Sequence, residues 1–268
     1  MRGPESESGW RTWLKAWLKD ERAAWQWLTV LPIGSSPYVR ETAAFPRALR
    51  AFPLVGALIG ALGALVLFLL HAMGASAHLA AFLATLAILL MTGALHEDGL
   101  ADFADALGGR DRQRRLAIMQ DSRIGAFGVL ALIMAVALPA LALADILEQH
   151  GIAAAMIALS TAHALSRLAA VWLLAALPPA RETGQSRAAG RPDRDVLLQA
   201  MSVAFLFGVL PGFFTFGVWF TLKALAAGTL AMLTLAAQAK RLLGGQTGDV
   251  AGATECVFRA AWLIMLSF

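Results

Sequence analysis

The chain has 268 residues, of which 59% are hydrophobic and only 15% charged, and its formal net charge is +4. A soluble domain carries about a quarter charged residues, and one with so few would aggregate, so the composition excludes a soluble globule. The single cysteine, Cys256, excludes a disulfide scaffold, and the apolar content excludes disorder. We expect a single helical bundle in a lipid bilayer.

The first fifty residues predict an amphipathic helix rather than a signal peptide. Trp10, Trp13 and Trp17 recur at helical spacing, with basic residues on the other faces. The segment has neither a continuous apolar core nor a small-residue cleavage site. This pattern is typical of a helix in the headgroup layer, so residues 1–50 are assigned to a cytosolic, interfacial region. A plain solvated leader is the alternative.

From residue 51 the chain is a series of apolar runs, and a helix needs roughly 20 such residues to cross a bilayer. Strand-like alternation does not recur along them, so helices are preferred over a barrel. The fold class is therefore all-α, a polytopic bundle of about seven transmembrane helices (six to eight) in a catalytic domain at 51–268. The expected spans are 51–72, 79–95, 126–147, 152–177, two within 196–237, and 250–268.

The distribution of Lys and Arg predicts the orientation of the bundle. Eight of these residues precede position 51, five lie in 96–125 and four in 178–195, whereas 73–78 and 148–151 contain none. Basic residues gather on the cytoplasmic side of membrane proteins. The N-terminus and the loops at 96–125, 178–195 and 238–249 are therefore expected in the cytoplasm.

The first of these loops carries three carboxylates at positions i, i+4 and i+7. Asp98, Asp102 and Asp105 would share one face of a helix, where they repel one another unless a cation lies among them. Ligands that are all oxygen favour a hard divalent ion, Mg²⁺ with Mn²⁺ as an alternative, over zinc. The competing interpretation is a solvated acidic helix paired with the arginines at 110–115.

Two further segments at membrane entries add groups that bind phosphate. Asp121 and Arg123 contribute a carboxylate and a fork-shaped guanidinium just before the span at 126. The sequence GGQTGD at 244–249 predicts a turn whose backbone N–H groups, with the dipole of the following helix, face an anion. Asp249 in it is either a metal ligand or a helix N-cap. Carboxylates, arginines and this turn together suit a diphosphate substrate.

One arginine, Arg167, falls in the middle of an expected span. An unpaired charge there is costly, so Arg167 should pair with a carboxylate or bind substrate, and substrate phosphate is slightly favoured.

Three stretches resemble the cobalamin synthase family, the adenosylcobinamide-GDP ribazoletransferases. They are MTGALHEDGLADFADALGG from residue 91, RRLAIMQDSRIGAFGVLAL from residue 114 and RLLGGQTGDVAGA from residue 241. Weaker similarity extends from about residue 25 to the C-terminus. Five positions depart from the family pattern. Ala94 and Ala106 stand where glycine is usual, and Glu97 stands where an apolar residue is usual. Val30 replaces an arginine, and Arg259 lies near where a glutamate is expected.

The resemblance implies a transferase of a late step in vitamin B12 (cobalamin) biosynthesis. A hydroxyl of α-ribazole or its 5′-phosphate attacks adenosylcobinamide-GDP, GMP leaves, and adenosylcobalamin or its 5′-phosphate forms with Mg²⁺. It also implies a multi-pass protein of the bacterial cell inner membrane whose active site faces the cytoplasm. The expected partners are the two substrates and the lipid bilayer, without nucleic acid, and a homo-oligomer is left open.

Residues and resemblance together give the expected site. The catalytic carboxylates are Asp98, Asp102, Asp105 and Asp121, and the metal ligands are these four with Asp249. The expected substrate-binding residues are Arg123, Arg167, Arg181, Gly244, Gly245, Gln246 and Thr247.

Two other functions share some of these sequence features. A phosphotransferase of the CDP-alcohol type also uses a helix-borne aspartate cluster, but here Asp102 replaces its usual arginine. A secondary transporter would carry charges near the midplane in repeated halves, and this chain has its carboxylates at the cytosolic ends without a visible repeat.

Overall fold

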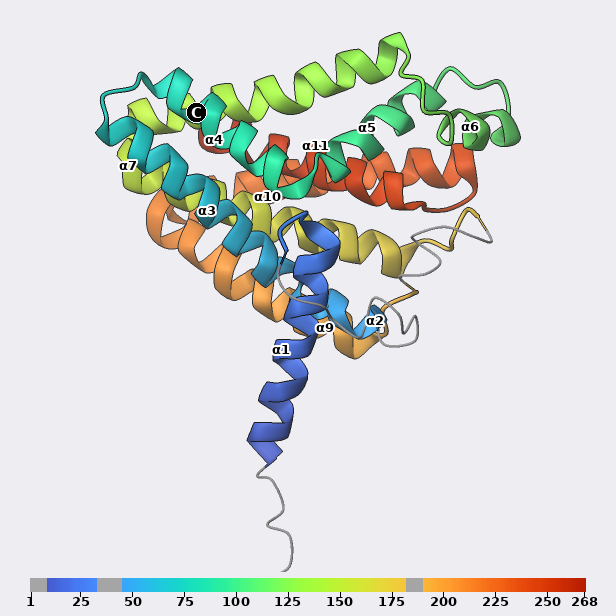
Figure 1. The fold of residues 1–268 in the computed structure, drawn as a ribbon, viewed down its shortest axis with the longest axis horizontal. Coiled ribbons are helices and arrows are strands. Elements are labelled where there is room, and N and C mark those ends of the chain that lie inside the picture. The colour runs from blue at the N-terminus through green and yellow to red at the C-terminus, as the bar shows by residue number, and fades with distance from the viewer. Residues whose placement is uncertain (1–8, 33–44, 182–189) are drawn as a thin grey trace, which may run out of the picture.

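The computed structural model describes residues 9–32, 45–181 and 190–268, and all of its regular elements are helices, which confirms the all-α prediction. Figure 1 shows most of them running across the molecule as a bundle. In chain order they are α1 (Gly9–Leu28), α2 (Phe45–Ala48), η2 (Leu49–Ala51), α3 (Phe52–Ala72), α4 (Ala77–Thr92), α5 (Leu95–Ala106), α6 (Arg112–Ile118), α7 (Ala126–Ala176), α9 (Arg194–Ala204), the π-helical turn η3 (Phe205–Val209), α10 (Leu210–Leu243) and α11 (Gly248–Leu266).

Several helices are long and apolar enough to cross a membrane. Three continuous stretches qualify by length and composition, Phe45–Ala72, Ala126–Ala176 and Arg194–Leu243, and a fourth is added if α4 and α5 form one bent span. The two longest are interrupted by glycines with non-helical backbone, Gly151 in α7 and Gly217 in α10. In Figure 1 the α7 ribbon turns back on itself, so one long helix supplies two antiparallel arms.

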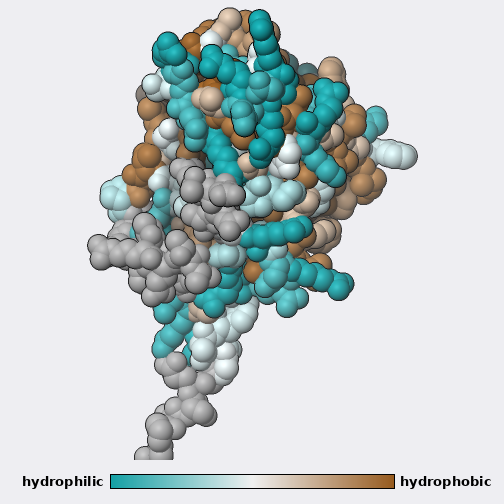
Figure 2. Space-filling view, turned by 90° about the vertical axis from the view of Figure 1, so that its right-hand side faces the viewer, coloured by the Kyte–Doolittle hydropathy of each residue, from teal (hydrophilic) through white to brown (hydrophobic). Residues whose placement is uncertain are grey.

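The connections 73–78 and 148–151, which contain no lysine or arginine, lie at the same end of the bundle. His78, at the start of α4, has its Nδ1 atom 3.6 Å from Oε1 of Glu148 near the break in α7. Gln149 donates a 3.1 Å hydrogen bond to the carbonyl of Ser267 near the C-terminus. The opposite end of the bundle carries α6 and the C-terminal ends of α5 and α10 (Figure 1). Figure 2 looks onto that opposite end, and hydrophilic residues gather over it.

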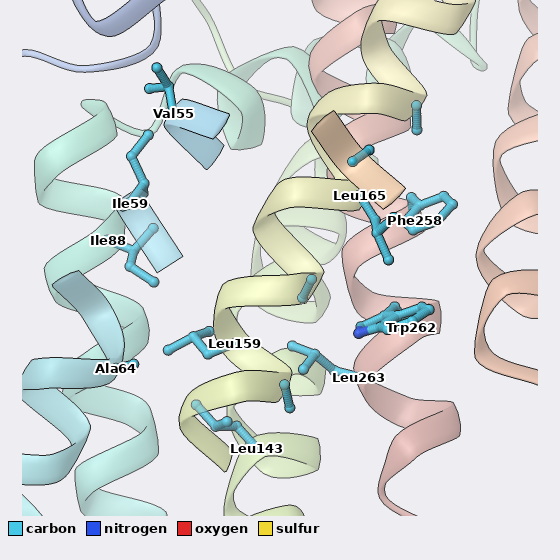
Figure 3. Close-up of a cluster of buried hydrophobic side chains, with 14 of the residues drawn as sticks. Val55, Ile59, Ala64, Ile88, Leu143, Leu159, Leu165, Phe258, Trp262 and Leu263 are labelled. Carbon is cyan, nitrogen blue, oxygen red and sulfur yellow. The ribbon is translucent and has the colours of Figure 1, made fainter. Parts of the chain in front are cut away.

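Small residues allow the central helices to pack closely, as is typical of membrane bundles. A Cβ on Gly60 of α3 would lie 2.7 Å from the carbonyl oxygen of Leu159 in α7, so the helix backbones nearly touch there. On the other side of α7, Trp262 and Leu263 of α11 are fully buried (Figure 3). Helix α7 is therefore the centre of the bundle, with α3 and α11 on either side of it.

A sharp bend between α4 and α5 sets the direction of the acidic segment. Gly93 and Ala94 both have left-handed backbone, with φ of 62° and 54°, and the two helices meet at 90°. The chain after α1 supports this bend, because the N–H of Val30 donates to the carbonyl of Met91 at 2.9 Å. As a result α5 leaves the axis of α4 and lies along α11.

Helix α1 is amphipathic, as expected. Trp10 and Trp13 are 61% and 59% exposed, whereas the far end of the helix is buried against α2 and α3. Asp20 anchors it, since its fully buried carboxylate pairs with Arg50 at 2.6 Å and with Arg47 at 3.2 Å. Figure 1 shows α1 lying across the bundle helices rather than along them.

Candidate active site

Two glycines bring the acidic helix α5 into backbone contact with the start of α11. A Cβ on Gly99 would lie 2.7 Å from Cα of Asp249, and one on Gly252 would lie 3.0 Å from Cα of His96. Only residues without side chains permit such an approach. The crossing places Asp98 and Asp102 of α5 next to Asp249 of α11. These three carboxylates were predicted to act together, although Asp249 is far from the other two in sequence.

The electrostatics of Asp102 confirm that these carboxylates crowd one another. Burial, followed by the negative charges of Asp98 and Asp249, raises the pKa of Asp102 to about 7. The charge of Asp105 adds to this, and the Arg181 guanidinium acts in the opposite sense. A cation beside Asp102 would stabilise its ionised carboxylate against both burial and the neighbouring negative charges.

The donor set fits a hard divalent cation whose shell is completed by substrate. Within the described ranges, no three His, Cys, Asp or Glu side chains converge into a metal cage on their own. Mg²⁺ is usually held by one or two carboxylates together with water and substrate phosphates, rather than by an all-protein cage. One or two of Asp98, Asp102 and Asp249, together with water and substrate oxygens, could hold such an ion.

Asp105 has a separate structural role that the sequence did not reveal. Its carboxylate accepts hydrogen bonds from the N–H groups of Gly125 at 2.7 Å and Gly128 at 2.8 Å. It therefore caps the N-terminus of α7 from a distance, which satisfies backbone donors that have no partner within the helix. These two hydrogen bonds tie the start of α7 to the end of α5. The role of Asp105 as a metal ligand stays a prediction.

Asp121 and Arg123 form a pair with each other at the rim of the site. Arg123 Nη2 lies 2.6 Å from Asp121 Oδ2, and the guanidinium is 87% exposed. Hydrogen bonds from Arg123 lower the pKa of Asp121 to about 2. The pair lines a cavity together with Asp98 and Asp102, so it lies beside the carboxylates that it was predicted to join.

The glycine-rich turn differs from its prediction. The N–H groups of Gly244 and Gln246 donate to the carbonyls of Lys240 and Pro178, so neither is free to bind an anion. Gly244, with φ of 76°, ends α10, and Gly245 packs so closely on Pro178 that a side chain would not fit. The role of Gly245 and Thr247 in substrate binding stays a prediction, whereas Gly244 and Gln246 use their amides within the turn. The reason is that residues 178–180 pair with it, which spacing alone could not indicate.

Thr247 begins α11 and leaves the Asp249 side chain free of capping. The Thr247 hydroxyl accepts the N–H of Val250 at 3.2 Å, as an N-cap does, and it donates to Asp249 Oδ2 at 3.2 Å. The N-cap alternative for Asp249 is thereby wrong. Arg181 Nη1 lies 3.8 Å from the same Asp249 oxygen, which adds a cation to the predicted phosphate-binding side.

A buried network of charged side chains lies beneath the site. Of its members, only Arg167 was predicted to be a site residue. Arg167 pairs with Glu255 of α11, and Arg259 of α11 bridges Glu255 at 3.3 Å and Glu97 at 2.6 Å. The primary partner of Arg167 is therefore a carboxylate, the less favoured of its two expected partners. Its Nε and Nη2 atoms have no hydrogen-bond partner among the described residues. Two charged positions within the last span, Glu255 and Arg259, were the indication in the sequence.

Asp98 lies between two cavities. The first, which we call the inner cavity, measures about 300 Å³, and the second, the outer cavity, about 310 Å³. The inner cavity is lined by Trp27, Leu28, Phe45, Leu49, Phe52, Leu95, His96, Asp98, Arg167, Ala170, Leu174, Arg181, Thr247, Gly248, Asp249, Ala251 and Gly252. The outer cavity is lined by Asp98, Ala101, Asp102, Met119, Gln120, Asp121, Ser122, Arg123, Ile124 and Leu132.

The long apolar helices and the carboxylate and arginine site at one end of them define a multi-pass helical membrane protein with an acidic site. The family model of cobalamin-5-phosphate synthase matches residues 20–267, so the chain belongs to that family of transferases. This membership decides against both the CDP-alcohol phosphotransferase and the transporter.

Curated relatives cover nearly the whole chain. A protein of Azorhizobium caulinodans is 43% identical over 252 residues, which are 92% of this chain and 94% of the relative. One of Bradyrhizobium diazoefficiens is 43% identical over 89% of both chains, and one of Rhizobium etli (strain CIAT 652) is 38% identical over 95% and 98%. Each is named adenosylcobinamide-GDP ribazoletransferase. No solved structure matches the chain.

Proposed function

We propose that this chain transfers the adenosylcobinamide phosphate of adenosylcobinamide-GDP to α-ribazole or its 5′-phosphate. A hydroxyl oxygen of the nucleoside forms a bond to the phosphorus next to the corrinoid, and the bond from that phosphorus to the GMP oxygen breaks. GMP leaves with the bonding electrons, and the hydroxyl proton passes to a carboxylate of the site. The products are adenosylcobalamin, or its 5′-phosphate, and GMP.

The observation that carries this proposal is the meeting of Asp98, Asp102 and Asp249 where α5 crosses α11. Burial, followed by the negative charges of Asp98 and Asp249, raises the pKa of Asp102 to about 7, so positive charge beside it would stabilise the ionised carboxylate. A diphosphate substrate and a divalent cation together satisfy this requirement. Arg181, close to Asp249, and the first N–H groups of α11 favour phosphate oxygens, whether of the donor diphosphate or of the acceptor's 5′-phosphate.

Bound Mg²⁺, with Mn²⁺ as an alternative, would supply charge neutralisation on the diphosphate oxygens. One or two of Asp98, Asp102 and Asp249 would hold it, with water and substrate oxygens completing the shell. A carboxylate of the cluster that is not a ligand would accept the proton of the attacking hydroxyl. Asp105 keeps the segment around Asp121 and Arg123 beside them, and Arg123 can exchange its Asp121 partner for a substrate phosphate because both are at the surface.

We also propose that the chain crosses the bacterial inner membrane about seven times. The passes are α3, α4, the two arms of α7, the two arms of the stretch Arg194–Leu243, and α11. The arginine-rich end, with α6, faces the cytoplasm, and α1 lies in the headgroup layer with Trp10 and Trp13 toward lipid.

The direct test is turnover by the purified full chain in lipid nanodiscs. We expect GMP to be released only when adenosylcobinamide-GDP, α-ribazole or its 5′-phosphate, and Mg²⁺ are all present, with one cobalamin product per GMP. GMP release that does not depend on the nucleoside would indicate hydrolysis and would contradict the proposal.

A further inference from the structure

Two chemically different groups of side chains line the inner cavity. The first is an aromatic cluster from the N-terminal part of the chain: the rings of Trp27 and Phe45 lie 4.3 Å apart, and those of Phe45 and Phe52 lie 6.1 Å apart edge to face. The second includes the carboxylates of Asp98 and Asp249. A ligand that fills this cavity needs a flat apolar part for the rings and a polar part for the carboxylates.

We infer that the inner cavity binds the acceptor nucleoside, with its base against the aromatic cluster and its ribose toward Asp98 and Asp249. This inference rests on the proposed function and adds to it the place of each reactant. The donor diphosphate then reaches Asp98 from the outer cavity, on the other side of α5, where Asp102 and Arg123 lie.

The size of the cavity supports the nucleoside over the donor. A volume of about 300 Å³ is at the lower end of small-molecule sites and suits a single nucleoside. An adenosylated corrinoid that carries GDP is many times larger and cannot enter. Its bulky part must remain outside, so only a thin diphosphate portion can approach the carboxylates.

The chemistry of the wall supports a benzimidazole over guanine. The base of α-ribazole has no amino or carbonyl group, whereas guanine presents several donors and acceptors that need partners when buried. Trp27, Phe45, Leu49, Phe52 and Leu174 on the apolar side offer stacking and apolar contact but no side-chain acceptor or amide. A buried guanine would leave its polar edge unsatisfied there.

The polar side chains suit the reacting ribose. Asp98 and Asp249 can accept hydrogen bonds from ribose hydroxyls, and Arg181 can bind a 5′-phosphate. Arg167, only 1% exposed, also lines the cavity and has two nitrogens without a hydrogen-bond partner among the described residues. A ligand oxygen that reached them would satisfy donors that the folded chain leaves open.

Adjacent alanines on α7 allow a matched test. Ala170 lines the inner cavity, whereas Ala169 lines a separate apolar cavity of about 270 Å³ between α7, α9 and α10. Ala170→Phe fills the first and Ala169→Phe the second, with the same change in volume on the same helix. Trp27→Ala removes part of the aromatic wall instead of filling the cavity, so it tests the same site without crowding.

The experiment measures equilibrium binding of radiolabelled α-ribazole and, separately, of adenosylcobinamide-GDP to each full-length variant in nanodiscs. We expect Ala170→Phe to weaken α-ribazole binding at least tenfold and Trp27→Ala about tenfold, while donor binding changes less than twofold. Ala169→Phe should leave the binding of both unchanged. Retained donor binding shows that each variant is folded.

Two results would overturn the inference. In one, Ala170→Phe weakens binding of the donor or of GMP more than that of α-ribazole, which would place the guanine nucleotide in the inner cavity. In the other, neither Ala170→Phe nor Trp27→Ala changes α-ribazole binding. Because binding is measured without turnover, a wild-type chain that binds α-ribazole here but releases no GMP would contradict the proposed function alone.

Discussion

Glu97 Oε1 and Arg259 Nη2 lie 2.6 Å apart, and both side chains are buried where α5 meets α11. These are two of the positions at which the chain departs from the family pattern that it resembles. The two departures are neighbours in space and compensate each other in charge. Together with Glu255 and Arg167 they form a network of two carboxylates and two guanidinium groups, so its charge is balanced.

Breaking this pair from one side should cost stability. Arg259→Leu leaves Glu97 buried without its partner, and we expect a loss of about 3 kcal/mol in the free energy of unfolding, with Glu97→Leu similar. The double variant restores charge balance and should recover most of that loss. Denaturant unfolding in mixed micelles measures all three. If the double variant loses as much stability as the two single variants added together, the two side chains are not coupled.

The exposed pair of His78 and Glu148 gives the control. Its side chains are 58% and 55% exposed, so Glu148→Gln should change the free energy of unfolding by less than about 0.5 kcal/mol.

Position 94 should accept glycine better than the alanine that it has. The left-handed backbone there, with φ of 54°, costs a non-glycine residue about 1–2 kcal/mol. Glycine avoids this cost but loses more conformational entropy on folding, which offsets part of the stabilisation. We expect Ala94→Gly to stabilise the protein by about 0.5–1 kcal/mol in the same unfolding assay. Destabilisation by this variant would show that the bend between α4 and α5 is not strained.

Removal of the Asp105 carboxylate should loosen the segment between α5 and α7. Asp105→Ala deprives Gly125 and Gly128 of their acceptor, a loss of about 1–2 kcal/mol for a helix cap. We expect tryptic cleavage at the arginines of α6 to become roughly tenfold faster. Asp193→Ala, which removes the cap of α9, should leave that cleavage unchanged. Unchanged cleavage in Asp105→Ala, with a higher Mg²⁺ requirement, would instead assign Asp105 to the metal.

The orientation can be tested with fused reporters. A reporter inserted in 178–195 should be cytoplasmic, and one in 73–78 periplasmic, because only the first of these connections carries arginines. Reporter activity on the reverse sides would overturn the proposed topology.

Helices, breaks and the acidic cluster could be predicted because they depend on local pattern. Apolar length predicted the bundle and the division of α7 between 147 and 152, although it did not locate the break in α10. The spacing of Asp98 and Asp102 predicted that they share one helix face. What depends on distant contacts could not be predicted. Asp105 caps a helix that begins about twenty positions later, and the pairing of Glu97 with Arg259 joins segments at opposite ends of the bundle domain.

Two of the amides in the turn at Gly244–Thr247 could not be assigned from the sequence for the same reason. A glycine-rich turn before a helix is typical of anion sites, yet the N–H of Gly244 donates to Lys240 of α10 and that of Gln246 to Pro178. Arg112 reinforces this arrangement, since it donates to the carbonyls of Ala180 and Leu243, both at 2.7 Å. A single sequence contains no indication that three separate loops meet there.

We propose that Asp98 and its neighbours act together on a cation and a diphosphate. The most direct measurement is GMP release by Asp98→Asn in nanodiscs over a range of Mg²⁺ concentrations, next to Asp145→Asn, a carboxylate of α7 toward the Gly151 break. We predict that Asp98→Asn lowers turnover at least a hundredfold at every Mg²⁺ concentration while Asp145→Asn retains it, and that chelation stops the wild type reversibly. Near-normal GMP release by Asp98→Asn, or release that continues after chelation, would contradict the account.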